Sequence, residues 1–184
     1  MPRTRYRTTM ADEIKEILLT EAEVSERVEA LAARVAPRLD DDTVAVCLLT
    51  GGLWFCADLM RALARHGRHV RFDALWLASY KDQRVSTGRC EVRADLQRPL
   101  VGQKALIVDD VFDTGLSLTE AARLVRDAGA SEVLTAVFAS KPWPTERGLK
   151  PDFVAWEAPG RFLVGYGMDV AGQYRGLPYI GAMD

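Results

Sequence analysis

The stretch 104–118, KALIVDDVFDTGLSL, constrains the fold of this 184-residue chain more than any other. Residues 105–108 form a continuous apolar run, which is typical of a strand buried on both faces of a sheet. Asp109 and Asp110 follow this run directly, and a small polar Asp-Thr-Gly-Leu-Ser segment then leads into a helix that we expect to begin near Ser117. A strand, an acidic tip and a glycine-containing loop at a helix N-terminus commonly hold a phosphate beside a sugar. The stretch therefore predicts a phosphate and sugar site.

Strand patterns and helix patterns alternate along the rest of the chain. A capping box at Thr20–Glu23 precedes an amphipathic helix that Pro37 closes. The expected strands are 43–49, 68–77, 101–108 and 132–138, with short ones at 153–156 and 162–166, and the other expected helices are 53–64 and 118–130. This alternation predicts a single α/β domain with a mostly parallel central sheet flanked by helices. Residues 1–12 are expected to be frayed, and the last Gly-rich stretch to be irregular.

Unusual residues follow three of the expected strands. Ligands of parallel sheets bind beyond the carboxyl ends of the strands. Thr50-Gly51-Gly52, the segment 109–117 and Lys141 all fall there. Two glycines between a strand and a helix expose backbone N–H groups to a ligand, but they are equally compatible with a tight turn that binds nothing. The polar excursion 79–95 is typical of either a mobile lid or a solvated hairpin.

The composition narrows the function classes. Hydrophobic residues make up 48%, charged residues 27%, and the net charge is −2, so nothing indicates a nucleic-acid or membrane partner. Cys47, Cys56 and Cys90 form no CxxC pair, which favours free thiols in a reducing compartment. No signal peptide and no apolar run of membrane-spanning length is visible. We therefore expect a cytoplasmic protein.

Several familiar active sites are excluded. The sequence has neither a GxxxxGK[ST] loop nor a GxGxxG fingerprint. Its two histidines, His66 and His69, flank Gly67 at an expected helix end, which argues against a histidine triad or a histidine-based zinc site. Chemistry must therefore come from carboxylates, lysines, backbone amides and a bound ion.

The acidic segment itself leaves alternatives open. Asp109 and Asp110 can form a hard-cation site, accept hydrogen bonds from sugar hydroxyls, or simply be solvated. Asp113-Thr114-Gly115 can be no more than a helix-capping turn.

The complete Asp-Asp-x-x-Asp-Thr-Gly pattern, however, closely resembles the phosphoribosyl pyrophosphate motif of type I phosphoribosyltransferases. LLTGGLWFCADLMRAL, WLASYKDQRVSTGRCEV and KPDFVAWEAPGRFLVGYGMDVAGQYRGLPYIG are similar to the first pyrophosphate loop, the mobile loop and the purine-binding hood of the hypoxanthine-guanine phosphoribosyltransferases. The resemblance spans about residues 20–182, in the order of that family. It implies a type I phosphoribosyltransferase fold with a core at about 20–140 and a hood largely at 141–184.

The resemblance also implies a reaction and roles for matched residues. Phosphoribosyl pyrophosphate and hypoxanthine or guanine would give IMP or GMP and pyrophosphate, with Mg²⁺, in a homodimer or homotetramer. Asp113 matches the general base that takes the proton from purine N7. The other matched positions are Asp109 and Asp110 for the ribose hydroxyls, directly or through Mg²⁺; Asp113, Thr114, Gly115, Leu116 and Ser117 for the 5′-phosphate; Leu49, Thr50, Gly51 and Arg175 for pyrophosphate; Lys141, Phe162, Leu163 and Asp169 for the purine side, with Asp169 also on Mg²⁺; and Ser79 and Tyr80 for the lid. A cis peptide bond between Leu49 and Thr50 is also implied.

The sequence departs from the family pattern at a few positions. Asp109 stands where Glu is frequent, Ser117 where Thr is usual, and Val170 where Tyr is usual. After Lys141 the family places one or two arginines, whereas here only Arg147 follows, slightly displaced. Two other classes compete: a regulator that binds nucleotide or RNA on the same fold, and a receiver-like signalling domain. The retained Asp113 and Lys141 and the acidic net charge disfavour the regulator. The position of the Asp pair past mid-chain, and not after the first strand, disfavours the receiver-like domain.

Overall fold

The computed structural model describes residues 14–79, 90–144 and 148–184. Its helices are α1 (Glu21–Val35), α2 (Leu53–Arg65) and α3 (Leu116–Asp127), with a 3₁₀ turn η1 (Ala36–Arg38). Its strands are β1 (Glu16–Leu19), β2 (Val44–Leu49), β3 (Arg71–Ser79), β4 (Cys90–Ala94), β5 (Lys104–Phe112), β6 (Glu132–Ser140), β7 (Phe153–Glu157), β8 (Leu163–Val164) and β9 (Ile180–Ala182).

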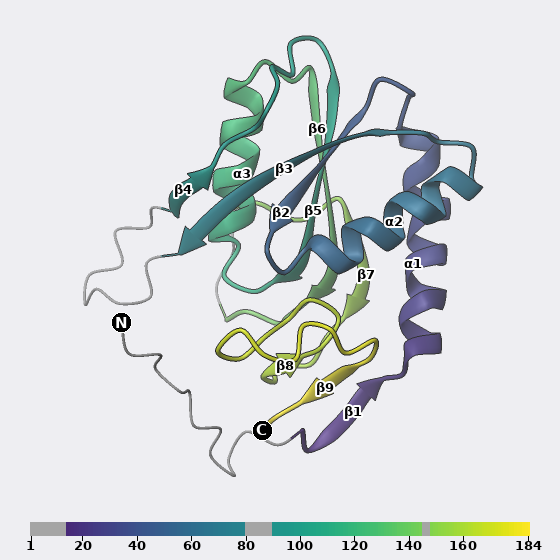
Figure 1. Cartoon of the computed structure of the whole chain (residues 1–184), viewed down its shortest axis with the longest axis vertical. Coiled ribbons are helices and arrows are strands. Elements are labelled where there is room, and N and C mark those ends of the chain that lie inside the picture. The colour runs from purple at the N-terminus through teal and green to yellow at the C-terminus, as the bar shows by residue number, and fades with distance from the viewer. Residues whose placement is uncertain (1–13, 80–89, 145–147) are drawn as a thin grey trace, which may run out of the picture.

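A six-stranded sheet in the order β4-β3-β2-β5-β6-β7 forms the centre of the molecule (Figure 1). β3, β2, β5, β6 and β7 run parallel, and β4 pairs antiparallel with β3 at one edge. The predicted α/β class with a mostly parallel sheet is therefore confirmed, and the polar excursion after β3 returns as the second strand of a hairpin.

Helices cover both faces of this sheet. α1 and α2 pack on one face over a core that includes Leu31, Phe55 and Phe138. α3 packs on the other face over a core that includes Ile107 and Val125. Alternate residues of β5 enter the two cores, because successive side chains of a strand point to opposite faces. The capping box is present as predicted: the Thr20 hydroxyl accepts from the Glu23 N–H, and the Glu23 carboxylate accepts from the Thr20 N–H.

Both ends of the described chain meet in a small antiparallel sheet of order β1-β9-β8, beyond the carboxyl ends of the parallel strands (Figure 1). β1 has no counterpart among the strands expected from the sequence, and the expectation that the last stretch is irregular is wrong for Ile180–Ala182, which forms β9. The pairing joins residues more than 160 positions apart, and no local pattern encodes such a contact.

Two boundaries near the acidic segment also differ from expectation. β5 does not end at Val108 but continues to Phe112, so Asp109 and Asp110 are strand residues. Pairing with β6 explains the extension: the ladder still joins Val111 to Ala139 and Phe112 to Ser140. α3 begins at Leu116 and ends at Asp127, earlier at both ends than predicted. No helix in the described part of the chain is long and apolar enough to cross a membrane.

Candidate active site

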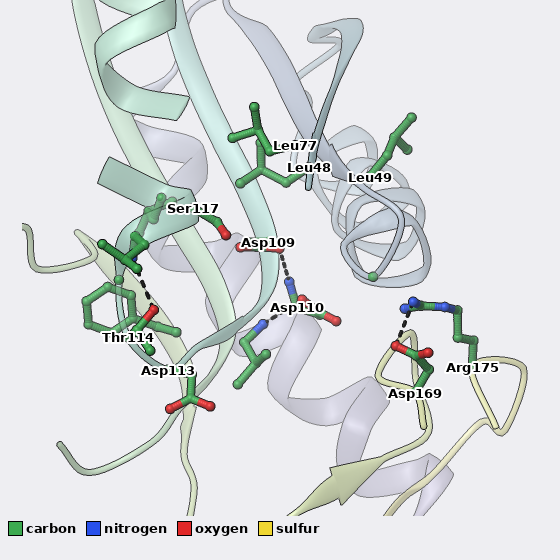
Figure 2. Close-up of a pocket in the computed structure, with 16 residues that line it drawn as sticks. Leu48, Leu49, Leu77, Asp109, Asp110, Asp113, Thr114, Ser117, Asp169 and Arg175 are labelled. Carbon is green, nitrogen blue, oxygen red and sulfur yellow. Dashed lines mark hydrogen bonds and ion pairs between the residues drawn. The ribbon is translucent and has the colours of Figure 1, made fainter. Parts of the chain in front are cut away.

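A cavity of about 480 Å³ lies between the carboxyl ends of the parallel strands and the C-terminal segment (Figure 2). Its lining combines a run that continues from β5 into α3 with residues from β2, β3 and the C-terminal loop: Leu48, Leu49, Gly51, Leu77, Asp109 to Leu118, Asp169 and Arg175. The structure thus brings together most of the residues proposed for the sugar, the 5′-phosphate, the pyrophosphate and the metal.

The loop between β2 and α2 lies directly against β5. The peptide bond between Leu49 and Thr50 is cis, as the family resemblance implies. A Cβ atom on Gly51 would overlap the Asp110 carboxylate, and one on Gly52 would stand 2.7 Å from the Leu48 carbonyl oxygen. The close approach of backbone atoms therefore requires glycine at position 52, whereas a side chain at position 51 would displace the Asp110 carboxylate or the loop.

Asp109 and Asp110 diverge, because they are consecutive residues of a strand. In Figure 2 the Asp109 side chain lies toward Ser117 on the α3 side, and that of Asp110 lies toward Asp169 and Arg175. The Asp110 N–H donates to the Asp109 carboxylate at 3.0 Å, and the Val111 N–H donates to the Asp110 carboxylate at 2.9 Å. The pair therefore faces two sides of the cavity and does not form one acidic tip.

Burial shifts the pKa of both carboxyl groups of this pair. Removal from water raises the pKa of Asp109 well above its ordinary value, and the neighbouring Asp110 carboxylate raises it further. Burial also raises the pKa of Asp110, while hydrogen bonds from Asp109 and Val111 and the charge of Arg175 oppose that rise. Hydroxyl donors or a cation in the cavity would stabilise the ionised forms.

The segment after β5 forms a tight turn at the N-terminus of α3. Gly115 adopts the left-handed conformation, with φ of 81°, and is the N-cap of α3. The Leu116 N–H donates to the Thr114 hydroxyl at 3.4 Å, and the Thr119 N–H donates to the Gly115 carbonyl at 3.0 Å. The first turn of α3 therefore opens into the cavity at its positive end, which favours a phosphate.

Lys141 reaches the same region from the end of β6. Its N–H donates to the Phe112 carbonyl at 3.0 Å, and its ammonium nitrogen lies 3.7 Å from the Asp113 carboxylate. The Lys141 side chain is 16% exposed and that of Asp113 47%, so this partly screened ion pair opens to solvent on the Asp113 side. The two residues proposed for purine N7 and O6 are neighbours.

Asp169 and Arg175 form an ion pair of 2.6 Å on the opposite wall (Figure 2). The second oxygen of Asp169 accepts from the Gly172 N–H at 2.7 Å, and the Arg175 guanidinium also donates to the Gly167 carbonyl. A short loop therefore presents a carboxylate and a guanidinium together.

Leu163 is the first residue of β8 and Phe162 directly precedes it, and neither residue lines the cavity. The Phe162 side chain is 47% exposed, and its N–H donates to the Asp184 carboxylate at 3.1 Å. Leu163 is buried and pairs with Ala182 of β9. Lys141 and Thr50 also lie outside the cavity lining. Of the residues proposed for the purine side, Asp169 lines the cavity, whereas Lys141, Phe162 and Leu163 lie outside its lining.

Some predicted residues cannot be placed, and some lining residues were missed. Tyr80 and Arg147 lie outside the described residues, and Ser79 is placed only as the last residue of β3. Leu48, Leu77 and Phe112 line the cavity but were not singled out from the sequence. Their signal was present, because each is an apolar residue at or near the carboxyl end of a parallel strand.

The fold and site match one family. Residues 18–171 match the model of the phosphoribosyl transferase domain. The chain therefore belongs to the phosphoribosyl transferase family, and the predicted enzyme class is confirmed.

Within this family the chain is similar to hypoxanthine-guanine phosphoribosyltransferases. It is 33% identical to that enzyme from Bacillus subtilis, covering 95% of this chain and 96% of the relative, and 30% identical to the Dictyostelium discoideum enzyme, covering 92% and 95%. A hypoxanthine phosphoribosyltransferase from Staphylococcus aureus superposes with a TM-score of 0.86 at 27% identity, over 98% of this chain and 97% of that one. The family resemblance inferred from the sequence is thus confirmed.

Proposed function

We propose that this chain is a purine salvage enzyme that transfers 5-phosphoribosyl from phosphoribosyl pyrophosphate to hypoxanthine or guanine, giving IMP or GMP and pyrophosphate. The observation that carries the proposal is one cavity that combines a helix N-terminus, four aspartates and an arginine, with Lys141 3.7 Å from the aspartate at position 113. In the reaction, the bond from purine N9 to the anomeric carbon forms as the bond from that carbon to pyrophosphate breaks.

The ribose phosphate end would occupy the α3 side. Backbone N–H groups of the turn 114–117 and the hydroxyls of Thr114 and Ser117 would bind the 5′-phosphate at the helix N-terminus. Asp109 and Asp110 would accept hydrogen bonds from the ribose hydroxyls. Their positions on β5, one of the two central strands of the six-stranded sheet, would hold the sugar rigidly relative to the phosphate.

Asp113 would act as general base. Its half-exposed carboxylate lies directly after β5, between the phosphate turn and Lys141. It would accept the proton from purine N7 as N9 attacks, which keeps positive charge from building up on the purine ring. The anomeric carbon becomes cation-like at the same time, so holding the purine close to the sugar is a major part of catalysis.

The pyrophosphate would bind on the opposite wall. Backbone amides of the loop at Leu49, Thr50 and Gly51 would contact it, and Arg175 would exchange its Asp169 partner for a phosphate oxygen. Its negative charge grows as it leaves, so these donors stabilise the transition state more than the bound substrate.

The residues present also fit Mg²⁺. No group of three or more His, Cys, Asp or Glu side chains within the described ranges is arranged to hold a metal ion by itself. Mg²⁺ typically binds through one or two carboxylates together with substrate phosphates, which matches Asp169 on one wall and Asp109 and Asp110 on the other. When bound, it would neutralise phosphate charge.

Purine selection would depend on Lys141, Phe162 and Leu163. The Lys141 ammonium can donate to the 6-oxo group of hypoxanthine or guanine but finds no acceptor on the 6-amino group of adenine. The exposed Phe162 ring would stack on the base, and the Leu163 backbone would contact its edge. Ser79 and Tyr80 would close over the reactants and exclude water.

The cellular location and the oligomeric state remain predictions: the enzyme is expected to be cytoplasmic and to form a homodimer or homotetramer. The non-catalytic regulator is not favoured, because the relatives that match nearly the whole chain are phosphoribosyltransferases.

A steady-state assay tests the proposal. The specificity constant kcat/KM is measured by absorbance for hypoxanthine, guanine and xanthine with phosphoribosyl pyrophosphate and Mg²⁺, with adenine as control. We expect turnover of hypoxanthine or guanine and very little of adenine. Equal turnover of adenine would contradict the proposed purine site.

A further inference from the structure

Tyr166 connects the C-terminal loop to α2. Its hydroxyl donates to the Asp58 carboxylate at 2.9 Å, and its ring packs edge-on against Phe138 of β6 at 5.0 Å between centroids. Phe138 in turn packs edge-on against Phe55 of α2 at 5.5 Å. The side chain is 4% exposed. Tyr166, a residue of the C-terminal loop, thus contacts both α2 and β6.

The backbone at this residue is unusual. Gly165, Tyr166 and Gly167 have φ values of 94°, 48° and 98°, three consecutive residues in the left-handed region. Glycine occupies this region freely, whereas a tyrosine there costs free energy. A tyrosine between two such glycines indicates that its side chain compensates for an unfavourable backbone.

The turn around Tyr166 supports the two charged residues of the cavity wall. The Tyr166 N–H donates to the Leu177 carbonyl at 2.8 Å, and the Gly167 N–H donates to the Arg175 carbonyl at 3.0 Å. The Gly167 carbonyl accepts from the Arg175 guanidinium, and Asp169 follows two residues later. Displacement of this turn would therefore displace both Asp169 and Arg175.

The other end of the hydrogen bond lies on the helix that begins at the pyrophosphate loop. Asp58 is in the second turn of α2, and α2 starts directly after Gly52. The turn also touches that loop, since a Cβ on Gly167 would overlap the Gly51 carbonyl oxygen. The two walls that would hold pyrophosphate therefore meet at Gly167 and are joined by the Tyr166–Asp58 hydrogen bond.

We propose that Tyr166 and Asp58 are a positioning pair that sets the spacing between the loop 49–52 and the Asp169–Arg175 wall. This inference rests on the proposed function, which identifies the ligand as pyrophosphate or as the pyrophosphoryl end of phosphoribosyl pyrophosphate. It touches neither reacting atoms nor the ribose and 5′-phosphate positions. Its loss should weaken binding of pyrophosphate and spare binding of a nucleotide that has none.

The chemistry of the bond suits this role. Arg61 lies 2.7 Å from the other oxygen of Asp58 and fixes the orientation of the carboxylate. Burial and the Asp58 charge raise the pKa of Tyr166, so its hydroxyl stays protonated and donates. A hydrogen bond from a buried hydroxyl to a carboxylate is stronger than one between neutral groups.

Tyr166→Phe removes the hydroxyl and keeps the ring. With Mg²⁺ at fixed concentration, the Kd values of pyrophosphate and of GMP are measured by calorimetry, together with the KM values of phosphoribosyl pyrophosphate and hypoxanthine. We expect the Kd of pyrophosphate and the KM of phosphoribosyl pyrophosphate to rise about three- to tenfold. This rise corresponds to part of the free energy of one charge-assisted hydrogen bond. The Kd of GMP and the KM of hypoxanthine should stay within about twofold.

Asp58 provides the reciprocal test. Asp58→Ala should reproduce the effect of Tyr166→Phe, the double variant should add nothing further, and Asp58→Asn, which keeps an acceptor for the hydroxyl, should restore most of the pyrophosphate affinity. Tyr179→Phe is the matched control, because Tyr179 is a half-buried tyrosine of the same C-terminal segment whose hydroxyl makes no hydrogen bond within the described residues.

Two results would overturn the positioning role while leaving the proposed function intact: an unchanged Kd of pyrophosphate in Tyr166→Phe, or an equal loss of GMP and pyrophosphate binding. Independent effects of the two single changes would do the same. A wild-type protein that binds neither ligand and forms no nucleotide would overturn the proposed function, and the positioning role with it.

Discussion

The Lys141 ammonium nitrogen lies 3.7 Å from the Asp113 carboxylate, so a hydrogen-bond donor and a base stand side by side. A 6-oxopurine carries N7 and O6 on one edge of its ring system. The pair therefore matches the two atoms that the proposed reaction must address, one by donation to O6 and the other by acceptance of the N7 proton.

Asp113→Asn should lower kcat by roughly tenfold to a thousandfold with a modest effect on KM, because the amide cannot accept the N7 proton in the transition state. Steady-state kinetics with hypoxanthine measure both constants. Asp127→Asn, on the exposed end of α3, is the control. Near-normal turnover would remove Asp113 from the role of general base.

Lys141→Ala should reduce the preference for 6-oxopurines over adenine roughly tenfold or more, since the donor that discriminates between an oxo and an amino group is lost. The quantity to compare is the ratio of kcat/KM for hypoxanthine to that for adenine. Lys150→Ala removes an exposed lysine in the following segment and should leave the ratio unchanged. An unchanged ratio in Lys141→Ala would contradict the assignment.

Gly51→Ala should lower kcat/KM for phosphoribosyl pyrophosphate by about tenfold or more, because the added methyl group would overlap the Asp110 carboxylate and displace either that carboxylate or the pyrophosphate loop. Gly148→Ala adds the same methyl group where no atom lies within 4 Å of it. Wild-type kinetics in Gly51→Ala would show that the loop can shift without loss of substrate.

Asp169→Asn should raise the Mg²⁺ concentration needed for half-maximal activity about tenfold, because one anionic ligand is lost while the shape of the side chain is kept. Activity is titrated against free Mg²⁺ at saturating purine, and removal of divalent cations with a chelator should abolish turnover of the wild type. A variant whose Mg²⁺ dependence matches the wild type would exclude Asp169 as a ligand.

The sequence alone was sufficient to predict the class of fold and the family, because buried parallel strands and the Asp-Asp-x-x-Asp-Thr-Gly segment carry strong local signals. It was insufficient for the direction of individual side chains. Asp109 and Asp110 were expected at a strand end, and only the continued pairing of β5 with β6 shows that they face opposite sides.

Contacts between distant segments were also beyond local reasoning. The pairing of β1 with β9 and the Tyr166–Asp58 hydrogen bond join residues that share no periodic pattern. In contrast, the capping box at Thr20 joins residues three positions apart, and the structure contains it as predicted.

The most direct test of the central claim is product stoichiometry. Purified protein is incubated with phosphoribosyl pyrophosphate, hypoxanthine and Mg²⁺, and IMP and pyrophosphate are quantified by chromatography. We expect both products to appear in equal amounts, with the rate strongly reduced in Asp113→Asn. Tight binding of IMP without formation of either product would contradict the account and favour a nucleotide-binding regulator on the same fold.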